Sequence, residues 1–382
     1  MIRHIPLNFY SDYTSGNVSK QWNKHISIFM SLAGLPPKLS NQEFNIFFVA
    51  TSNIATALEL AAPVSFDYSL QEHVLVLPVV LLFMADLPMH AEITSTMQTN
   101  VSLQPCRICK LKAKNKKEKA TGTYVDNFIG CKPNGYNTVM KVIQEDQDTR
   151  LVFNIKKIHE EMTQQLFNPF FELKGFDGHK DTPVEVLHVA KYLIQHYSSL
   201  VGKDFKVLIQ AEPFESERKI WTSLCHLCSF IFQTHIRDLK KYTAKINYFT
   251  QDFLLKLISA SAQWVNKPKF HMLIHLSQSI ARFGPASLFA TEKFESYNGV
   301  VCQASIHSNC QSPSPDIANT FLNYSALRYC LSGGYLQTES SRSNISSTYQ
   351  VKNLLLNTPS IQNLLGLDSQ TFKQKPRFPF FF

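Results

Sequence analysis

Three acidic residues have the type and the order needed to bind divalent metal ions. Asp12 follows a strand-like segment, Asp86 follows another, and Glu295 lies in a helix-like segment near the end of the predicted folded part. Three carboxylates can hold two Mg²⁺ or Mn²⁺ ions, which activate an attacking oxygen and stabilise a leaving one in phosphoryl transfer. The chain has 29 acidic residues, so three in this order are easily found by chance. Taken alone, the order favours ordinary roles over a metal site: a loop or N-cap residue for Asp12, a turn residue for Asp86 and an exposed helix residue for Glu295.

A second set of residues has the spacing of a zinc site. Cys106 and Cys109 form a Cys-x-x-Cys pair, and His271 and His275 lie four positions apart. Histidines at i and i+4 share one helix face, so both rings can reach the same ion. Together the four residues predict a closed, structural Cys2His2 zinc site between distant parts of the chain. The alternative is two reduced cysteines and two ordinary histidines.

Other cysteines and histidines are assigned simpler roles. Cys131 is a spare candidate ligand. Cys225 and Cys228 repeat the Cys-x-x-Cys spacing, but their apolar helical flanks predict buried core thiols. The remaining histidines with no obvious partner are predicted to be surface or core residues: His25, His73, His90 and His226.

A lysine-rich stretch directly follows the first cysteine pair. Such a run is compatible with a solvated loop. The functional alternative is a patch that contacts phosphates, or a nuclear import signal. The net charge of +9 favours a polyanionic partner such as DNA, and a nuclear location fits the same feature. The lysines are Lys110, Lys112, Lys114, Lys116, Lys117 and Lys119.

The segments that must position these residues form an α/β pattern. Four apolar segments are predicted as strands, and the first three, with short connections, suggest an antiparallel meander. An RNase H-like fold, which is a mixed sheet with flanking helices, has this layout of acids: one after the first strand, one after the fourth and a Glu in a late helix. The predicted strands are 2–11, 25–33, 44–50 and 74–85, with helical composition at 52–62.

Four regions are predicted along the chain. Residues 1–150 form the N-terminal part of the core and contain the Cys-x-x-Cys pair, and residues 151–265 form a mostly helical insertion. Residues 266–330 return to the core with the zinc histidines and Glu295, and the Ser-, Asn- and Gln-rich residues 331–382 are predicted to be a poorly ordered tail. Helices of the insertion are expected at 152–166, 184–197, 218–233 and 238–261.

Composition excludes several classes of protein. No apolar run reaches the roughly 18 residues of a membrane helix, so no membrane association is expected. The N-terminus lacks the pattern of a signal peptide, and eight cysteines are too few for a disulfide scaffold, which predicts reduced thiols. No P-loop, dinucleotide-binding or nucleophile-elbow motif occurs.

Four stretches resemble the transposases of CACTA (En/Spm-type) DNA transposons, especially the transposon-derived reading frames of mushroom-forming fungi. They span residues 9 to about 310 in the order expected for that family. They are FYSDYTSGNVSKQWNKHISIFMSLAGLPPKLSNQEFNI, VLPVVLLFMADLPMHAEIT with PCRICKL, FNPFFELKGFDGHKDTPVEVLH, and KPKFHMLIHLSQSIARFGPASLFATEKFESYNGV.

The resemblance implies a DDE transposase on an RNase H-like core with a helical insertion. Asp12 matches the first acid of that family, Asp86 the second and Glu295 the third, with Glu292 the weaker choice. The cysteine and histidine pairs are similar to the zinc site of the related V(D)J recombinase core. Implied partners are transposon ends and target DNA, with a homo-oligomer possible.

The resemblance also has departures. The family's [Cys/Asp]-x-x-His motif occurs here as Glu185-Val-Leu-His188, and the segment after it is shorter than the family pattern. The chain begins almost at the first catalytic strand, so we expect a truncated and internally deleted copy. Two functions follow as expectations: DNA cleavage and strand transfer, or a catalytically silent, zinc-stabilised DNA-binding or interaction protein.

Overall fold

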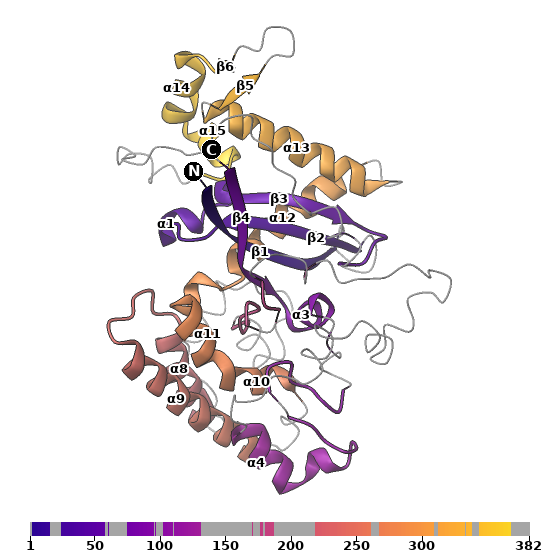
Figure 1. Ribbon diagram of the computed structural model, residues 1–382, viewed down its shortest axis with the longest axis vertical. Coiled ribbons are helices and arrows are strands. Elements are labelled where there is room, and N and C mark those ends of the chain that lie inside the picture. The colour runs from indigo at the N-terminus through magenta and orange to yellow at the C-terminus, as the bar shows by residue number, and fades with distance from the viewer. Residues whose placement is uncertain are drawn as a thin grey trace. The chain divides into compact units, whose positions relative to one another are not determined.

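The structure is a computed structural model in which the chain forms two compact units. Unit 1 comprises Met1–Thr56, Val76–Pro78 and Lys293–Phe382, and unit 2 comprises Ala57–Leu75 and Val79–Glu292. The described residues are 2–15, 24–57, 60, 75–94, 96, 102–109, 111–130, 170, 176–178, 180–186, 218–260, 267–308, 312–332, 334–337 and 344–367. Together they form a mixed α/β protein with a four-stranded mixed sheet (Figure 1).

The first three strands of unit 1 form the predicted antiparallel meander. They are β1 (Ile2–Ser15), β2 (Lys24–Leu32) and β3 (Ile46–Ser52), and they pair β1 with β2 and β2 with β3. The fourth strand, β4 (Leu75–Ala85), lies beside β1 in the order β3-β2-β1-β4. Short elements between β2 and β3 are α1 (Pro37–Ser40) and the 3₁₀ turn η1 (Glu43–Asn45).

The first strand is longer than the sequence predicts. The sequence predicts Asp12 directly after the strand, in a loop, but β1 continues to Ser15 and Asp12 lies opposite Ser27 of β2. The polar residues at 12–15 favour a turn when the chain is considered locally. Cross-strand pairing with β2 overrides that preference, as tertiary context often does.

Two helices cover one face of this sheet with aromatic side chains. They are α12 (Glu292–Ile306) and α13 (Pro313–Leu331), which runs alongside β3 (Figure 1). The ring of Tyr10 on β1 stacks on that of Phe294 at 4.7 Å between centroids. Phe48 of β3 stacks on Phe321 of α13 at 4.5 Å. These contacts fix α12 along β1 and α13 along β3.

The C-terminal region contributes to the core of unit 1. Composition predicts a poorly ordered tail from residue 331, but the described part contains β5 (Tyr335–Gln337), β6 (Asn344–Ser346), α14 (Tyr349–Asn357) and α15 (Pro359–Leu364). Leu355, Leu365 and Leu367 are buried against Phe44 and Leu331. These leucines supply the apolar surface that a stable contact needs. Because they are few, the average composition of the region does not reveal them.

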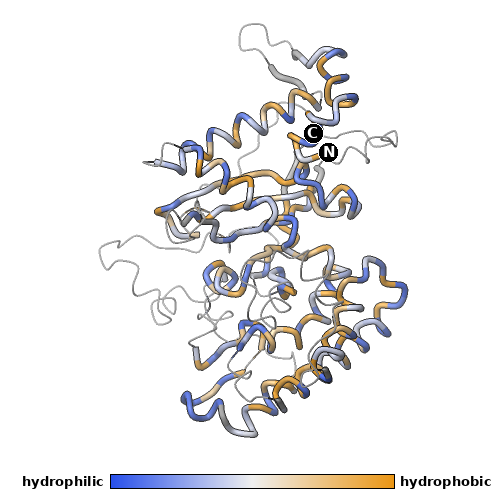
Figure 2. Tube along the Cα trace, turned by 180° about the vertical axis from the view of Figure 1, so that it is seen from behind, coloured by the Kyte–Doolittle hydropathy of each residue, from blue (hydrophilic) through white to orange (hydrophobic). Residues whose placement is uncertain are grey.

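Unit 2 is built mainly from helices. The predicted helices at 218–233 and 238–261 are confirmed as α8 (Arg218–Ile231) and α9 (Leu239–Ala260), which pack against each other. Hydrophobic and hydrophilic residues alternate along α9 (Figure 2), as expected when one face is buried. The other elements are α3 (Leu87–Ile93), η3 (Glu118–Ala120), α4 (Gly122–Gly130), α10 (Pro268–Met272), η9 (Leu273–His275), α11 (Leu276–Phe283) and η10 (Ala286–Leu288).

Two further helix predictions have different outcomes. The predicted helix at 152–166 lies outside the described residues. The helix expected from Val184 does not begin there, since residues 184–186 are neither helix nor strand. In this stretch the backbone N–H of Val184 donates to Ser279 Oγ at 3.2 Å, so tertiary contacts replace the helical hydrogen bond. None of the helices in the described part of the chain combines the length and hydrophobicity that a membrane span requires.

We predict that unit 1 depends on the aromatic contacts of α13. Phe321→Ala should lower the free energy of unfolding by about 3–5 kcal/mol, because it removes a fully buried ring. Leu322→Ala, at the adjacent position with 68% exposure, should change it by less than about 0.5 kcal/mol. Urea titrations followed by circular dichroism measure both. Equal effects of the two substitutions would contradict the packing described.

Candidate functional site

Unit 2 contains a buried cluster of two cysteines and two histidines. Cys106, Cys109, His271 and His275 each offer one ligand atom, and these atoms all lie within 4.8 Å of one another. Cys106 Sγ is 3.3 Å from His275 Nε2, and Cys109 Sγ is 3.1 Å from His271 Nε2. Tetrahedral ligands of a zinc ion stand roughly 3.5 Å apart, given metal–ligand distances of about 2.0–2.3 Å. The four predicted zinc ligands therefore meet, with a donor set suited to a structural zinc ion.

The cysteines are held by a tight turn with its own hydrogen bonds. The backbone N–H groups of Ile108 and Cys109 lie 3.3 and 3.4 Å from Cys106 Sγ and donate to it. N–H donors stabilise a thiolate over a thiol, because they interact with its negative charge. The turn thus prepares Cys106 to be a metal ligand.

The histidines lie on a helical segment that changes from α-helix to 3₁₀ helix between them. His271 belongs to α10 and His275 to the 3₁₀ turn η9, so the two residues still share one side of the segment. His271 Nδ1 is 2.8 Å from the carbonyl oxygen of Phe128, and it must be the donor because a carbonyl only accepts. This bond places the proton on Nδ1 and leaves Nε2 for an ion, as is usual for a zinc-bound histidine.

Local electrostatics favour the protonation states that bind metal. Burial acts to raise the pKa of the Cys106 thiol, but hydrogen bonding with Cys109 and the charges of His271 and His275 hold the pKa well below its ordinary value. Burial lowers the pKa of His275, which favours the neutral imidazole. Burial and the nearby cysteines raise the pKa of Tyr124 to about 12. Zinc binding needs a deprotonated cysteine and a neutral histidine, so a low thiol pKa and a low imidazole pKa both act in its favour.

The arginine between the two cysteines connects the cluster to the turn after β4. The guanidinium of Arg107 is buried and donates to Thr182 Oγ1 at 2.8 Å, to the Thr182 carbonyl oxygen at 2.9 Å and to His90 Nδ1 at 3.4 Å. His90 then donates from Nε2 to the carbonyl oxygen of Phe83 at 3.1 Å. Although burial lowers the pKa of Arg107 to about 10, the group stays charged at neutral pH.

Sequence reasoning missed both members of this link. The sequence predicts an ordinary histidine without a clear partner at position 90, and it assigns no role to Arg107. Burial and the charge of Arg107 lower the pKa of His90, which fits a neutral ring that accepts at Nδ1. The position of Arg107 inside the Cys-x-x-Cys pair was the only hint in the sequence.

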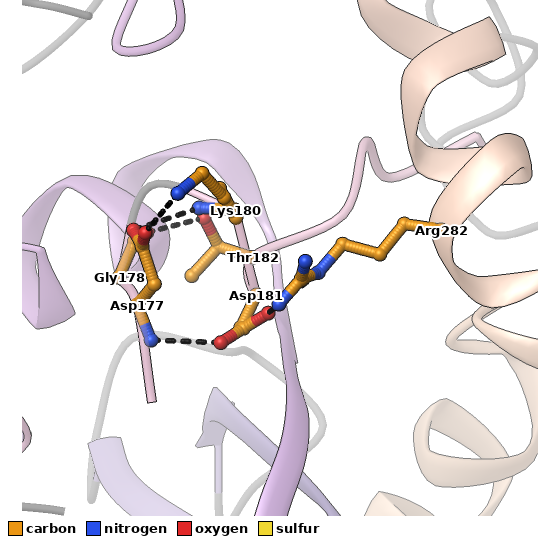
Figure 3. Close-up of polar contacts among 6 residues, drawn as sticks. All are labelled: Asp177, Gly178, Lys180, Asp181, Thr182 and Arg282. Carbon is orange, nitrogen blue, oxygen red and sulfur yellow. Dashed lines mark hydrogen bonds and ion pairs between the residues drawn. The ribbon is translucent and has the colours of Figure 1, made fainter. Parts of the chain in front are cut away.

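A short segment around Asp181 is held by polar contacts among its own residues and by a contact with Arg282 of α11 (Figure 3). The carboxylate of Asp181 is buried and accepts from Arg282 Nε of α11 at 2.8 Å and from the backbone N–H of Asp177 at 2.7 Å. The Asp181 carbonyl oxygen accepts from the Phe83 N–H at 2.7 Å. Burial raises the pKa of Asp181 even with these donors present. This segment therefore ties β4 to the helix that follows the zinc histidines.

Only part of the Glu185–His188 motif is described. Glu185 is buried, and its Oε1 accepts from Thr291 Oγ1 at 3.2 Å. His188 lies outside the described residues. Glu185 therefore has a structural contact in unit 2, and the role implied for the motif stays a prediction.

Two of the three predicted catalytic acids, Asp12 and Glu295, belong to unit 1, and the helix that carries Glu295 contacts Asp12. Asp12 Oδ2 accepts from Tyr10 Oη at 2.7 Å and from Asn298 Nδ2 at 3.2 Å. Asn298 lies on α12 one turn after Glu295, so both residues share the side of the helix near Asp12. Helix packing, not sequence proximity, places Asn298 beside Asp12.

Asp86 belongs to unit 2 and caps a helix. Its Oδ1 accepts from the backbone N–H of Met89 at 2.9 Å, as expected of an N-cap residue at the start of α3. Asp86 follows β4 directly, as predicted. The meeting of all three carboxylates stays a prediction.

The lysine-rich stretch forms a surface loop. Lys112, Lys114, Lys116 and Lys117 are exposed, and Lys110 lies outside the described residues. Lys119 is half-buried and donates from Nζ to the Ser102 carbonyl oxygen at 2.9 Å, so it has a structural contact. The four exposed ammonium groups are available to a polyanion.

Comparisons with models of protein families and with curated protein sequences find no match to this chain.

We predict one zinc ion per chain, held by the Cys2His2 cluster. Elemental analysis of purified protein should give about one zinc, and Cys106→Ser should lose it because sulfur is replaced by a poor zinc ligand. Cys225→Ser is the matched control, since Cys225 and Cys228 have the same spacing but lie outside the cluster. Zinc-free wild-type protein, or equal loss from both variants, would show that the cluster is not a metal site.

We also predict a pH dependence of stability that comes from Lys293. Burial lowers the pKa of this amine from 10.5 to about 8. Between these values the unfolded chain binds a proton that the folded chain does not, so stability rises with pH across this window. Lys293→Met should be more stable than wild type below pH 8 and should lose that part of the slope.

Urea midpoints measured from pH 7 to 10.5 test this prediction. Lys241→Met is the control, because the Lys241 side chain is 83% exposed and should leave the slope unchanged. A wild-type slope that survives in Lys293→Met would mean that the amine is not responsible.

Proposed function

We propose that this chain is a transposase-derived protein with an RNase H-like core, which cleaves DNA and transfers strands by two-metal phosphoryl transfer. The observation that supports it best is the contact between Asp12 and Asn298, which sets α12, the helix of Glu295, against β1. The strand order β3-β2-β1-β4 adds support, since β1 carries Asp12 and β4 directly precedes Asp86. The resemblance to CACTA transposases assigns the acidic roles to the same residues.

The residues fit a site for magnesium in their chemistry. Asp12, Asp86 and Glu295 would hold the ions, since magnesium prefers hard carboxylate oxygens. When bound, magnesium supplies activation of a water or 3′-hydroxyl oxygen and stabilisation of the leaving oxygen. In the described structure Tyr10 and Asn298 orient the carboxylate of Asp12 by donating to one of its oxygens. Hydrogen-bond support of this kind keeps a ligand in place.

The lysine loop fits a role in DNA binding. Lys112, Lys114, Lys116 and Lys117 are exposed, and the loop directly follows the cysteine turn. Lysines that neutralise phosphates release counterions, so binding should weaken steeply with salt. Nuclear localisation and assembly into homo-oligomers on transposon ends belong to the same proposal.

An alternative function is a catalytically silent DNA-binding or interaction protein with a zinc-stabilised core. The specific observation in its favour is that Asp86 already serves as the N-cap of α3. The Cys2His2 cluster needs no catalytic role to stabilise unit 2. Both functions share salt-dependent binding to DNA.

The experiment that separates them measures nicking of supercoiled DNA with Mg²⁺, together with DNA binding. Asp12→Asn and Glu295→Gln should each reduce nicking by roughly 10³-fold or more, because the acids act as one unit. DNA affinity and its salt dependence should stay unchanged. Asp126→Asn, which alters an exposed carboxylate on α4, should nick like the wild type. Wild-type protein that binds DNA but never nicks it would favour the silent alternative.

A further inference from the structure

The side-chain amide of Asn298 lies directly against the first predicted catalytic acid. Its Nδ2 donates to Asp12 Oδ2 at 3.2 Å. The carboxylate can only accept, so the nitrogen end of the amide must face Asp12. The oxygen end, Oδ1, is therefore not part of this hydrogen bond.

The packing of α12 fixes this orientation. Phe294 stacks on Tyr10, and Tyr297 meets Phe29 edge to face with 5.4 Å between centroids. Both aromatic residues precede Asn298 within about one helical turn and are almost completely buried. The helix has little freedom to rotate, so the amide stays beside Asp12.

The amide oxygen lacks a hydrogen bond. Asn298 Oδ1 is buried and has no donor among the residues that the structure describes. An unsatisfied buried acceptor is costly and is rare in native proteins. The usual reasons for such an atom are a bound water or a bound ion.

We propose that Asn298 Oδ1 is a further oxygen ligand of the divalent cation bound at Asp12, an inference that rests on the proposed function. An amide oxygen is a hard, neutral ligand of the kind that Mg²⁺ and Mn²⁺ accept. One side chain then does two things: its nitrogen orients the Asp12 carboxylate, and its oxygen completes the coordination. Glu295 on the preceding turn supplies a charged ligand from the same side of α12.

The test is a Mn²⁺ titration of the purified protein, with free ion measured by electron paramagnetic resonance. Asn298→Ala should weaken binding by tenfold or more, within the range seen when supporting groups of metal sites are removed. Asn298→Asp should keep Mn²⁺ binding, since it keeps an oxygen ligand and its added charge offsets the lost donor to Asp12. Gln303→Ala, which removes an exposed amide from the same helix, should match wild type.

The outcomes separate this inference from the proposed function. Equal affinity of wild type and Asn298→Ala, with binding lost in Asp12→Asn, would overturn the role of Asn298 alone. Loss of binding in Asn298→Asp would also overturn it, since that pattern belongs to a residue that only donates to Asp12. Should Asn298→Ala fail to fold by circular dichroism, Asn298→Asp decides by itself. Equal binding by wild type and Asp12→Asn would instead reject the cation site.

Discussion

The contact between two short segments far apart in the chain is the constraint on which unit 2 depends. Cys106 and His275 are separated by 169 positions, yet their ligand atoms lie 3.3 Å apart. Closing so long a loop costs conformational entropy that grows slowly with its length. A metal ion shared by four buried ligands can offset this cost, because its binding free energy becomes folding free energy. The cluster therefore fixes α10 and η9 against the cysteine turn.

The constraint extends outward through hydrogen bonds. Arg107 donates a hydrogen bond to His90, and His90 donates one to the carbonyl oxygen of Phe83 near the end of β4. Asp181 adds a second connection, since it contacts both Phe83 through its backbone and Arg282 through its carboxylate. The start of α3 is thus supported by groups that belong to, or adjoin, the metal cluster. A structural site in unit 2 can in this way hold the start of α3, where Asp86 is the N-cap residue.

Local pattern predicted some of this structure and tertiary contacts determined the rest. The meander, β4, α8 and α9 follow from apolar periodicity, and the four metal ligands follow from spacing that the chemistry of zinc requires. The end of β1 could not be predicted, because pairing with β2 decides it. The contacts of Arg107 and Asn298 depend on which helices pack together, and no local pattern encodes that. Val184 is non-helical for the same reason, since Ser279 accounts for its backbone hydrogen bond.

The most direct test of the account is X-ray absorption at the zinc edge on the purified full chain. We expect a first shell of two sulfur atoms at about 2.3 Å and two nitrogen atoms at about 2.0 Å. Cys225→Ser should leave this spectrum unchanged. A shell of nitrogen and oxygen alone, or one with four sulfur atoms, would contradict the Cys2His2 centre.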